Sequence, residues 1–237
     1  HRQLTHALIA GAVNPIPSPD AEQQARTNVL ARYWVADTAG MTAAWEEAGY
    51  EPIFPTETAL LALAYANQGN DRARELAVSL ARFSRSEALA IVAYLECRHR
   101  SGADPSGKLL ASIETLQDTP WMLSHVAELV LLSAGPAAAA DPAAAPRLWA
   151  ALNEPFALYA FGPEREAALM AVSPLAGLPA AADFVQSLEP FIPWTEAFLS
   201  LRVQVYQQTA NPLLGQARGD LAKFRDAKTA GAPLASF

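Results

Sequence analysis

His125 and Glu128 are the first residues to consider for chemistry, because they lie three positions apart within a helical pattern. Two side chains with this spacing share one face of a helix and can bind the same metal ion. Their order is the reverse of the Glu-x-x-His pair of di-iron helical bundles, and the sequence contains no second copy of the motif. We therefore predict neither a metal site nor a cofactor.

Other catalytic signatures are missing from the sequence as well. It contains no Gly-x-Ser-x-Gly motif and no Gly-rich phosphate-binding loop. The adjacent carboxylates Glu46 and Glu47 are typical of a solvated helix face, and His99 lies in a last helical turn, where a cation favours the helix dipole. Cys97 is the only cysteine, which excludes a disulfide framework and a cysteine zinc site, and we expect it in the core. We therefore predict no catalytic residues and no enzyme.

The composition sets limits on the partners. Hydrophobic residues make up 51% of the 237 residues, as in a folded protein. A formal net charge of −7 argues against nucleic acid and anionic membranes, which attract fields of Lys and Arg. No apolar run is long enough to span a membrane. Because the chain begins with His1, we expect a mature product or a fragment of a longer protein, soluble and either cytoplasmic or periplasmic.

Start and stop signals of helices recur along the whole chain. Ser18 before Pro19, the Ser84–Glu87 capping box and Asp104 before Pro105 are typical helix starts. Glycines follow several apolar-periodic runs, as they do at helix ends; these are Gly69, Gly102, Gly135 and Gly162. The pattern predicts helices near 2–12, 19–38, 41–48, 56–68, 71–82, 85–100, 106–117, 120–133, 147–152, 155–161, 164–171, 180–188, 194–209 and 213–228. The alternating segment 201–206 is also predicted to be helical, because both of its flanks have helical spacing.

One segment of unusual composition divides the chain. Residues 135–146 are rich in Ala and Pro, and their prolines limit any helix to about one turn. We therefore predict a helical repeat half at 1–134, a linker at 135–146 and a second helical half at 147–237.

Residues 56–83 predict a pair of antiparallel helices. Leu60, Leu61, Ala64 and Tyr65 form one apolar face, and Ala73, Leu76, Ala77 and Leu80 form an answering face after the break at Gly69. Small residues between the leucines allow close helix packing. One such hairpin leaves an outer apolar face uncovered, so it has to stack on another.

The segment 61–73, LALAYANQGNDRA, resembles the tetratricopeptide repeat, in which a small residue and Tyr precede a Gly turn. A second resemblance lies in a hairpin at 194–228, where 201–224 places Tyr206 before a turn and an A-x-x-x-L-A-x-F pattern. The first match is one residue short after Gly69, Ala210 replaces the second turn Gly, and the units between fit a period of about 34 poorly. The resemblance implies an all-α fold of stacked antiparallel hairpins, a right-handed α-solenoid.

In that family the groove-facing positions correspond to Asn67 in the first hairpin and to Gln204, Gln207 and Gln208 in the second. Amide side chains there can hydrogen-bond to an extended peptide backbone. Aromatic residues gather near both ends of the chain, at Tyr33, Trp34, Trp45 and Tyr50 and again at Phe191, Trp194, Phe198, Tyr206 and Phe224. We expect most of them to pack between helices, and one or two to line a groove for a peptide or a polysaccharide.

The sequence therefore predicts a non-catalytic protein–protein interaction scaffold that binds a protein or peptide, part of a larger bacterial assembly. The alternative is an auxiliary helical domain of a larger enzyme or secretion system that acts on cell-wall material or exopolysaccharide.

Overall fold

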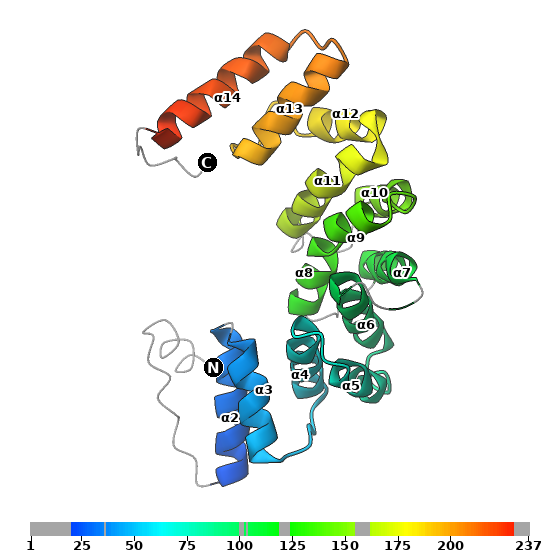
Figure 1. Ribbon diagram of the computed structural model, residues 1–237, viewed down its shortest axis with the longest axis vertical. Coiled ribbons are helices and arrows are strands. Elements are labelled where there is room, and N and C mark those ends of the chain that lie inside the picture. The colour runs from blue at the N-terminus through cyan, green and yellow to red at the C-terminus, as the bar shows by residue number, and fades with distance from the viewer. Residues whose placement is uncertain are drawn as a thin grey trace.

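The computed structural model describes residues 20–35, 37–99, 102, 104–118, 124–154 and 162–229. Within these ranges every regular element is a helix, so the predicted all-α class is confirmed (Figure 1). In chain order the helices are α2 (Ala21–Trp34), α3 (Thr38–Ala48), α4 (Pro55–Asn67), α5 (Arg72–Leu80), α6 (Arg85–His99), α7 (Pro105–Asp118), α8 (Ser124–Leu132), α9 (Ala134–Ala140), α10 (Ala145–Asn153), α11 (Gly162–Ala176), α12 (Leu178–Ser187), α13 (Glu196–Gln208) and α14 (Leu214–Thr229). The helices expected at 2–12 and 155–161 lie outside the described residues.

Several helix ends differ from the prediction because other residues supply the caps. The helix predicted at 19–38 ends at Trp34, and the helix predicted at 41–48 begins at Thr38, since the Asp37 side chain accepts a hydrogen bond from the Gly40 amide at 2.9 Å and starts α3. Asp20, rather than the expected Ser18, caps α2 by accepting from the Glu22 amide at 2.9 Å. The segment 201–206 is helical as predicted, within α13.

The Ala/Pro-rich segment contains a helix longer than the single turn that we expected there, and its role as a linker stays a prediction. Its first part forms α9, and Ala134, Gly135, Ala137 and Ala138 are buried. Pro136 is accommodated because it stands in the first turn, where amides have no partner within the helix. Gly135 therefore lies inside a helix and does not end one. The division of the chain into two halves stays a prediction.

The helices pack mainly on their neighbours in the chain. All the substantial contacts join helices at most three places apart, and they include the series α2–α4, α4–α6, α6–α8 and α8–α11. In Figure 1 the helices follow an open arc, with α4, α8 and α11 on its inner side and α5, α7 and α10 on its outer side. One apolar core runs from α4 to α14, and a smaller one joins α2, α3 and α4.

The predicted hairpin at 56–83 is present as α4 and α5. Both predicted faces are buried, but Leu61 and Ala64 pack in the smaller core with α2 and α3, whereas Ala73, Ala77 and Leu80 lie in the larger core with Tyr65. None of the described helices has both the length and the apolar character needed to cross a bilayer.

Two turns of the chain have closely similar geometry. After α4, Gly69 has a φ of +69° and the Asn70 amide donates to the Tyr65 carbonyl at 3.0 Å. After α13, Ala210 has a φ of +51° and the Asn211 amide donates to the Tyr206 carbonyl at 2.9 Å.

In each turn an Asn side chain also accepts a hydrogen bond from a backbone amide near the start of the next helix. The Asn70 side chain accepts from the Arg72 amide, and the Asn211 side chain accepts from the Leu213 amide, both at 2.9 Å. Ala210 thus takes the left-handed conformation that Gly69 adopts without steric cost.

The packing of α9 yields a first prediction. A Cβ atom on Gly135 would lie 2.7 Å from the Ala171 Cβ of α11, so Gly135→Ala should push the two helices apart. We expect a loss of about 1–3 kcal/mol in the free energy of unfolding, measured by urea titration.

Gly219→Ala in α14 is the matched control, since a Cβ there would meet no atom within 4 Å. It should stabilise the protein by about 0.5–1 kcal/mol, because Ala is the better helix former. Equal gains from both substitutions would contradict the close approach of α9 to α11.

Candidate functional site

The residues considered for reactivity make contacts that support the fold. Cys97 is buried as expected, its Sγ lies 3.4 Å from the Pro105 carbonyl oxygen, and burial raises its pKa to about 11. A thiol of this kind is protonated at neutral pH and is a poor nucleophile. Among the described residues no group of three or more His, Cys, Asp or Glu side chains is placed to hold a metal ion. The His125 side chain lies outside that description.

His99 caps a helix, but not its own. Its Nε2 lies 2.9 Å from the carbonyl oxygen of Ala66, in the last turn of α4. The ring also fills the space beside Gly69, where a Cβ would lie 2.9 Å from it. The expected interaction with the end of α6 is therefore corrected, because the side chain reaches across to the neighbouring helix.

The predicted groove residue Asn67 belongs to a polar cluster that four helices build. Its Oδ1 accepts a hydrogen bond from the hydroxyl of Tyr94 on α6, and the Arg98 guanidinium lies 5.9 Å from the centre of the Tyr94 ring. Tyr33 of α2 and Glu128 of α8 complete the group, since the Glu128 carboxylate acts electrostatically on Tyr33. We call these five residues the Asn67 cluster.

The cluster is suited to hydrogen bonding. Burial is the main cause that raises the pKa of Tyr33 to about 12, with further contributions from Glu128 and Tyr94. Burial also raises the pKa of Tyr94, and nearby Arg98 opposes this only in part. Both phenols therefore stay protonated at neutral pH and remain donors.

The position of the cluster follows from the packing order. α2, α4, α6 and α8 each contact the next member of this series, so side chains from four segments of the chain meet. Asn67 is the last residue of α4, while Tyr94 and Arg98 lie one turn apart near the end of α6. The sequence analysis missed Tyr94 and Arg98, although an aromatic residue four positions before an Arg is the usual spacing for contact on one helix.

The other predicted groove residues lie elsewhere. Gln204, Gln207 and Gln208 are exposed on α13, and Gln207 accepts a hydrogen bond from Arg218 of α14 at 3.3 Å. No substantial contact joins α4 with α13, so the structure does not bring Asn67 and the three glutamines to one place.

Of the aromatic residues expected between helices, four are buried, and Tyr33, Tyr50 and Trp194 are half-buried. Trp45, Phe198, Tyr206 and Phe224 are buried, whereas Phe191 is 90% exposed in the loop before α13.

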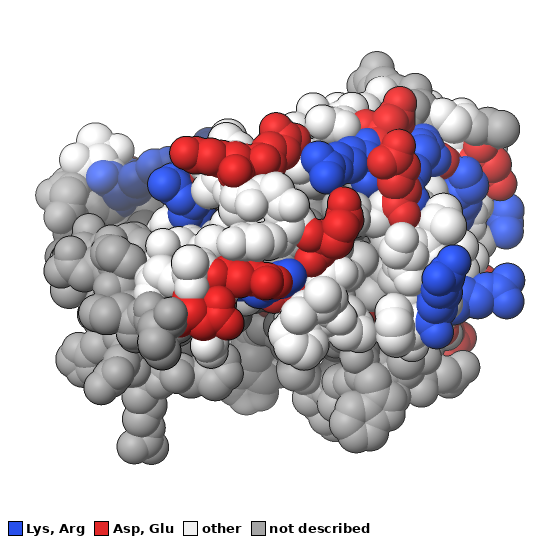
Figure 2. All heavy atoms as spheres, turned by 90° about the horizontal axis from the view of Figure 1, so that it is seen from below, with Lys and Arg blue, Asp and Glu red and all other residues white. Residues whose placement is uncertain are grey.

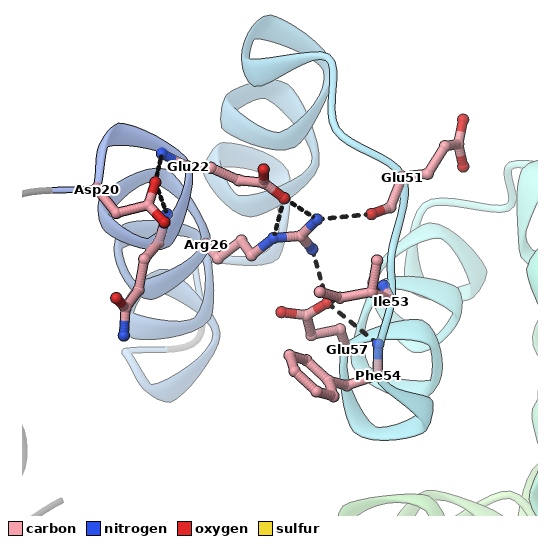
Figure 3. Close-up of polar contacts among 8 residues, drawn as sticks. Asp20, Glu22, Arg26, Glu51, Ile53, Phe54 and Glu57 are labelled. Atoms are coloured by element: carbon pink, nitrogen blue, oxygen red, sulfur yellow. Dashed lines mark hydrogen bonds and ion pairs between the residues drawn. The ribbon is translucent and has the colours of Figure 1, made fainter.

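Buried ion pairs hold the helices that carry these residues. Figure 3 shows Arg26 extending from α2 toward the loop before α4. Its Nη1 lies 2.8 Å from Glu57 Oε2, its Nη2 donates to the Glu51 carbonyl at 2.9 Å, and its Nε donates to Glu22 at 2.9 Å. Glu57 also accepts from the Ile53 amide at 3.2 Å, so one arginine fixes α2, the loop and the start of α4.

Two further ion-pair networks also join neighbouring elements. Glu96 of α6, 1% exposed, binds Arg74 of α5 at 2.6 Å and Lys108 of α7 at 2.7 Å. Arg202 of α13 is completely buried and binds Glu189 at 2.7 Å and Asp220 of α14 at 2.8 Å. Each network ties one helix to the elements before or after it.

Glu96 gives a prediction on pH. Burial alone would raise its pKa, but the hydrogen bonds and charges of Lys108 and Arg74 outweigh burial and lower the pKa. A carboxylate with a lowered folded pKa stabilises the protein above its unfolded pKa, about 4.3, and this contribution is lost as pH falls through the folded pKa.

Glu96→Gln should therefore reduce stability at pH 7 by about 1–3 kcal/mol, and its urea midpoint should fall less steeply than the wild type between about pH 5 and 3. Glu47→Gln, on an exposed carboxylate of α3, should leave both the midpoint and its slope with pH unchanged. Parallel pH profiles for the wild type and Glu96→Gln would refute the role of the network.

Figure 2 shows the molecule from below, and on this face acidic and basic side chains are interspersed with uncharged ones.

In the comparisons with known proteins, no family model, no curated protein and no solved structure matches this chain.

Proposed function

We propose that this chain is a non-catalytic interaction scaffold within a larger bacterial assembly, built as a right-handed, tetratricopeptide-like α-solenoid. One observation carries the proposal: the turns after Tyr65 and Tyr206 have the same hydrogen bonds, although 141 positions separate the two tyrosines along the chain. Similar turns in similar hairpins are what a repeated unit produces.

The tyrosines that precede these turns each contact a carboxylate and an arginine, although Arg72 follows Tyr65 on the next helix and Arg202 precedes Tyr206 on the same helix. Tyr65 donates to Glu46 at 2.9 Å beneath the Arg72 guanidinium, and Tyr206 donates to Glu189 at 2.7 Å beneath the Arg202 guanidinium. Both rings are 1% exposed. The packing order supports the same proposal, since units in a solenoid contact only their neighbours.

α14 has one apolar and one polar side. It buries Ala217 and Phe224 but exposes Arg218, Lys223 and Arg225. Among the described helices it packs on α13, its neighbour in the chain.

The Asn67 cluster supplies the chemistry for binding an extended segment of a partner protein. The Asn67 Oδ1 is occupied by Tyr94, which leaves its two amide N–H groups to donate to a peptide carbonyl. In the second hairpin Gln208 stands two residues after Tyr206, as Asn67 stands two residues after Tyr65. Gln204 and Gln208, both exposed, are proposed as the corresponding contacts at the other end of the arc.

A capture experiment from native lysate tests this function. We expect the wild-type domain to retain a defined protein, and Asn67→Ala with Gln204→Ala and Gln208→Ala to reduce its retention at least about tenfold, since each lost hydrogen bond costs about 0.5–1.5 kcal/mol. Circular dichroism should show that the variant is folded.

The matched control removes three other exposed amides, with Asn153→Ala, Gln186→Ala and Gln216→Ala. A partner lost equally from both triple variants would reject the chosen surface. A wild type that retains a polysaccharide and no protein would favour the auxiliary-domain alternative.

A further inference from the structure

Three hollows adjoin one another on the outer side of the arc, between α7 and the α9–α10 segment. They have volumes of about 310, 140 and 330 Å³. Asp104, Ser106 and Asp141 line both the first and the second hollow, and Leu110 and Arg147 line both the second and the third. The shared walls make the hollows one continuous depression, which we call the α7–α10 trough.

The composition of the helices explains why the trough stays open. Its walls contain many small residues, including Gly107, Ala137, Ala143 and Ala150, whose side chains do not reach across to the opposite helix. From Asp104 to Glu114 the trough follows α7 for ten positions, about 15 Å at the rise of an α-helix. This length matches about four or five residues of an extended chain.

The trough carries five exposed charged side chains. Asp104 and Asp141 stand at one end, Glu114 and Glu154 at the other, and Arg147 between them. No ion pair of these five side chains is found within the described part of the chain, but the Glu154 carboxylate acts electrostatically on Arg165 of α11. Among the described residues, the Asp104 side chain accepts a hydrogen bond from the Gly107 amide, at 2.9 Å and through Oδ1. By contrast, Arg26, Glu96 and Arg202 are all held in ion pairs.

We propose that the α7–α10 trough binds an extended basic segment of a partner protein. Four carboxylates outnumber the single guanidinium, so the trough carries net negative charge and attracts cations. Two basic side chains about four residues apart reach the two carboxylate pairs, and the small wall residues leave room for their stems. Arg147 donates to carbonyl groups of the bound segment.

This site goes beyond the proposed function. The residues of the trough differ from those of the Asn67 cluster. The groups that would bind the partner are carboxylates in the trough and neutral amides in the cluster. In Figure 1 α7 and α10 lie on the outer side of the arc, away from α4 and α8.

Fluorescence anisotropy with a labelled heptapeptide tests the proposal. The probe carries two arginines four positions apart among Gly, Ala and Ser, and a second probe carries glutamates in their place. We expect saturable binding of the basic probe alone, weakened at least about tenfold by Glu114→Lys with Glu154→Lys, a change of about 1.4 kcal/mol. Both positions are exposed, so the double variant should fold.

Two further variants separate a site from general attraction to an acidic protein. Glu47→Lys with Asp183→Lys changes the charge equally at exposed positions elsewhere and should leave affinity within about twofold of wild type. Ala143→Trp fills the central hollow without changing charge and should also weaken binding.

Three outcomes would overturn the proposal. Equal weakening by both charge-reversal pairs would mean non-specific attraction. No saturable binding of the basic probe would leave the trough without a ligand of this class, and equal affinity for the acidic probe would assign the site to Arg147 alone.

Discussion

Ion pairs buried at the junctions between neighbouring helices are the interaction on which this architecture depends. Because the substantial contacts of the described helices join near neighbours, few distant contacts can compensate for a junction that loosens. Arg26 fixes α2 to α4, Glu96 joins α5, α6 and α7, and Arg202 joins α13 to α14. Removing one partner of a fully buried pair costs about 3–5 kcal/mol, whereas exposed pairs contribute about 0–1 kcal/mol. The pairs of Glu96 fall between these limits, because Arg74 and Lys108 are 36% and 42% exposed.

Small residues at the helix interfaces have two consequences. Where they face each other in register, backbones approach closely, as at Gly135 against Ala171. Where they face a gap, nothing fills the space, and the hollows beside Gly107 and Ala143 remain. The same Ala-rich composition thus produces both the dense core and the trough, and the difference lies in which helices it places opposite each other.

Helices and turns that depend on neighbouring residues could be predicted from the sequence. Side-chain contacts between residues far apart in the chain could not. The α4–α5 hairpin was predictable because its apolar spacing and its Gly69 turn lie within one short segment. α9 was missed because prolines were taken as breaks, although Pro136 stands in a first turn that tolerates it. Asn67 was identified through a resemblance, but its partner Tyr94 comes from another helix, α6. The Arg26–Glu57 pair joins residues 31 positions apart, and no local pattern selects such a pair.

The two proposed surfaces share one support, the α6–α7 pair. α6 carries Tyr94 and Arg98 of the Asn67 cluster, and α7 carries Asp104 and Glu114 of the trough. Glu96 lies between Tyr94 and Arg98 in sequence and binds Lys108 of α7 at 2.7 Å. This ion pair links the helices that carry the Asn67 cluster and the α7–α10 trough. It keeps the two surfaces at a fixed separation, although they share no residues. Two segments bound on opposite sides of one junction would then be held close together by the proposed scaffold, which raises the effective concentration of each segment for the other.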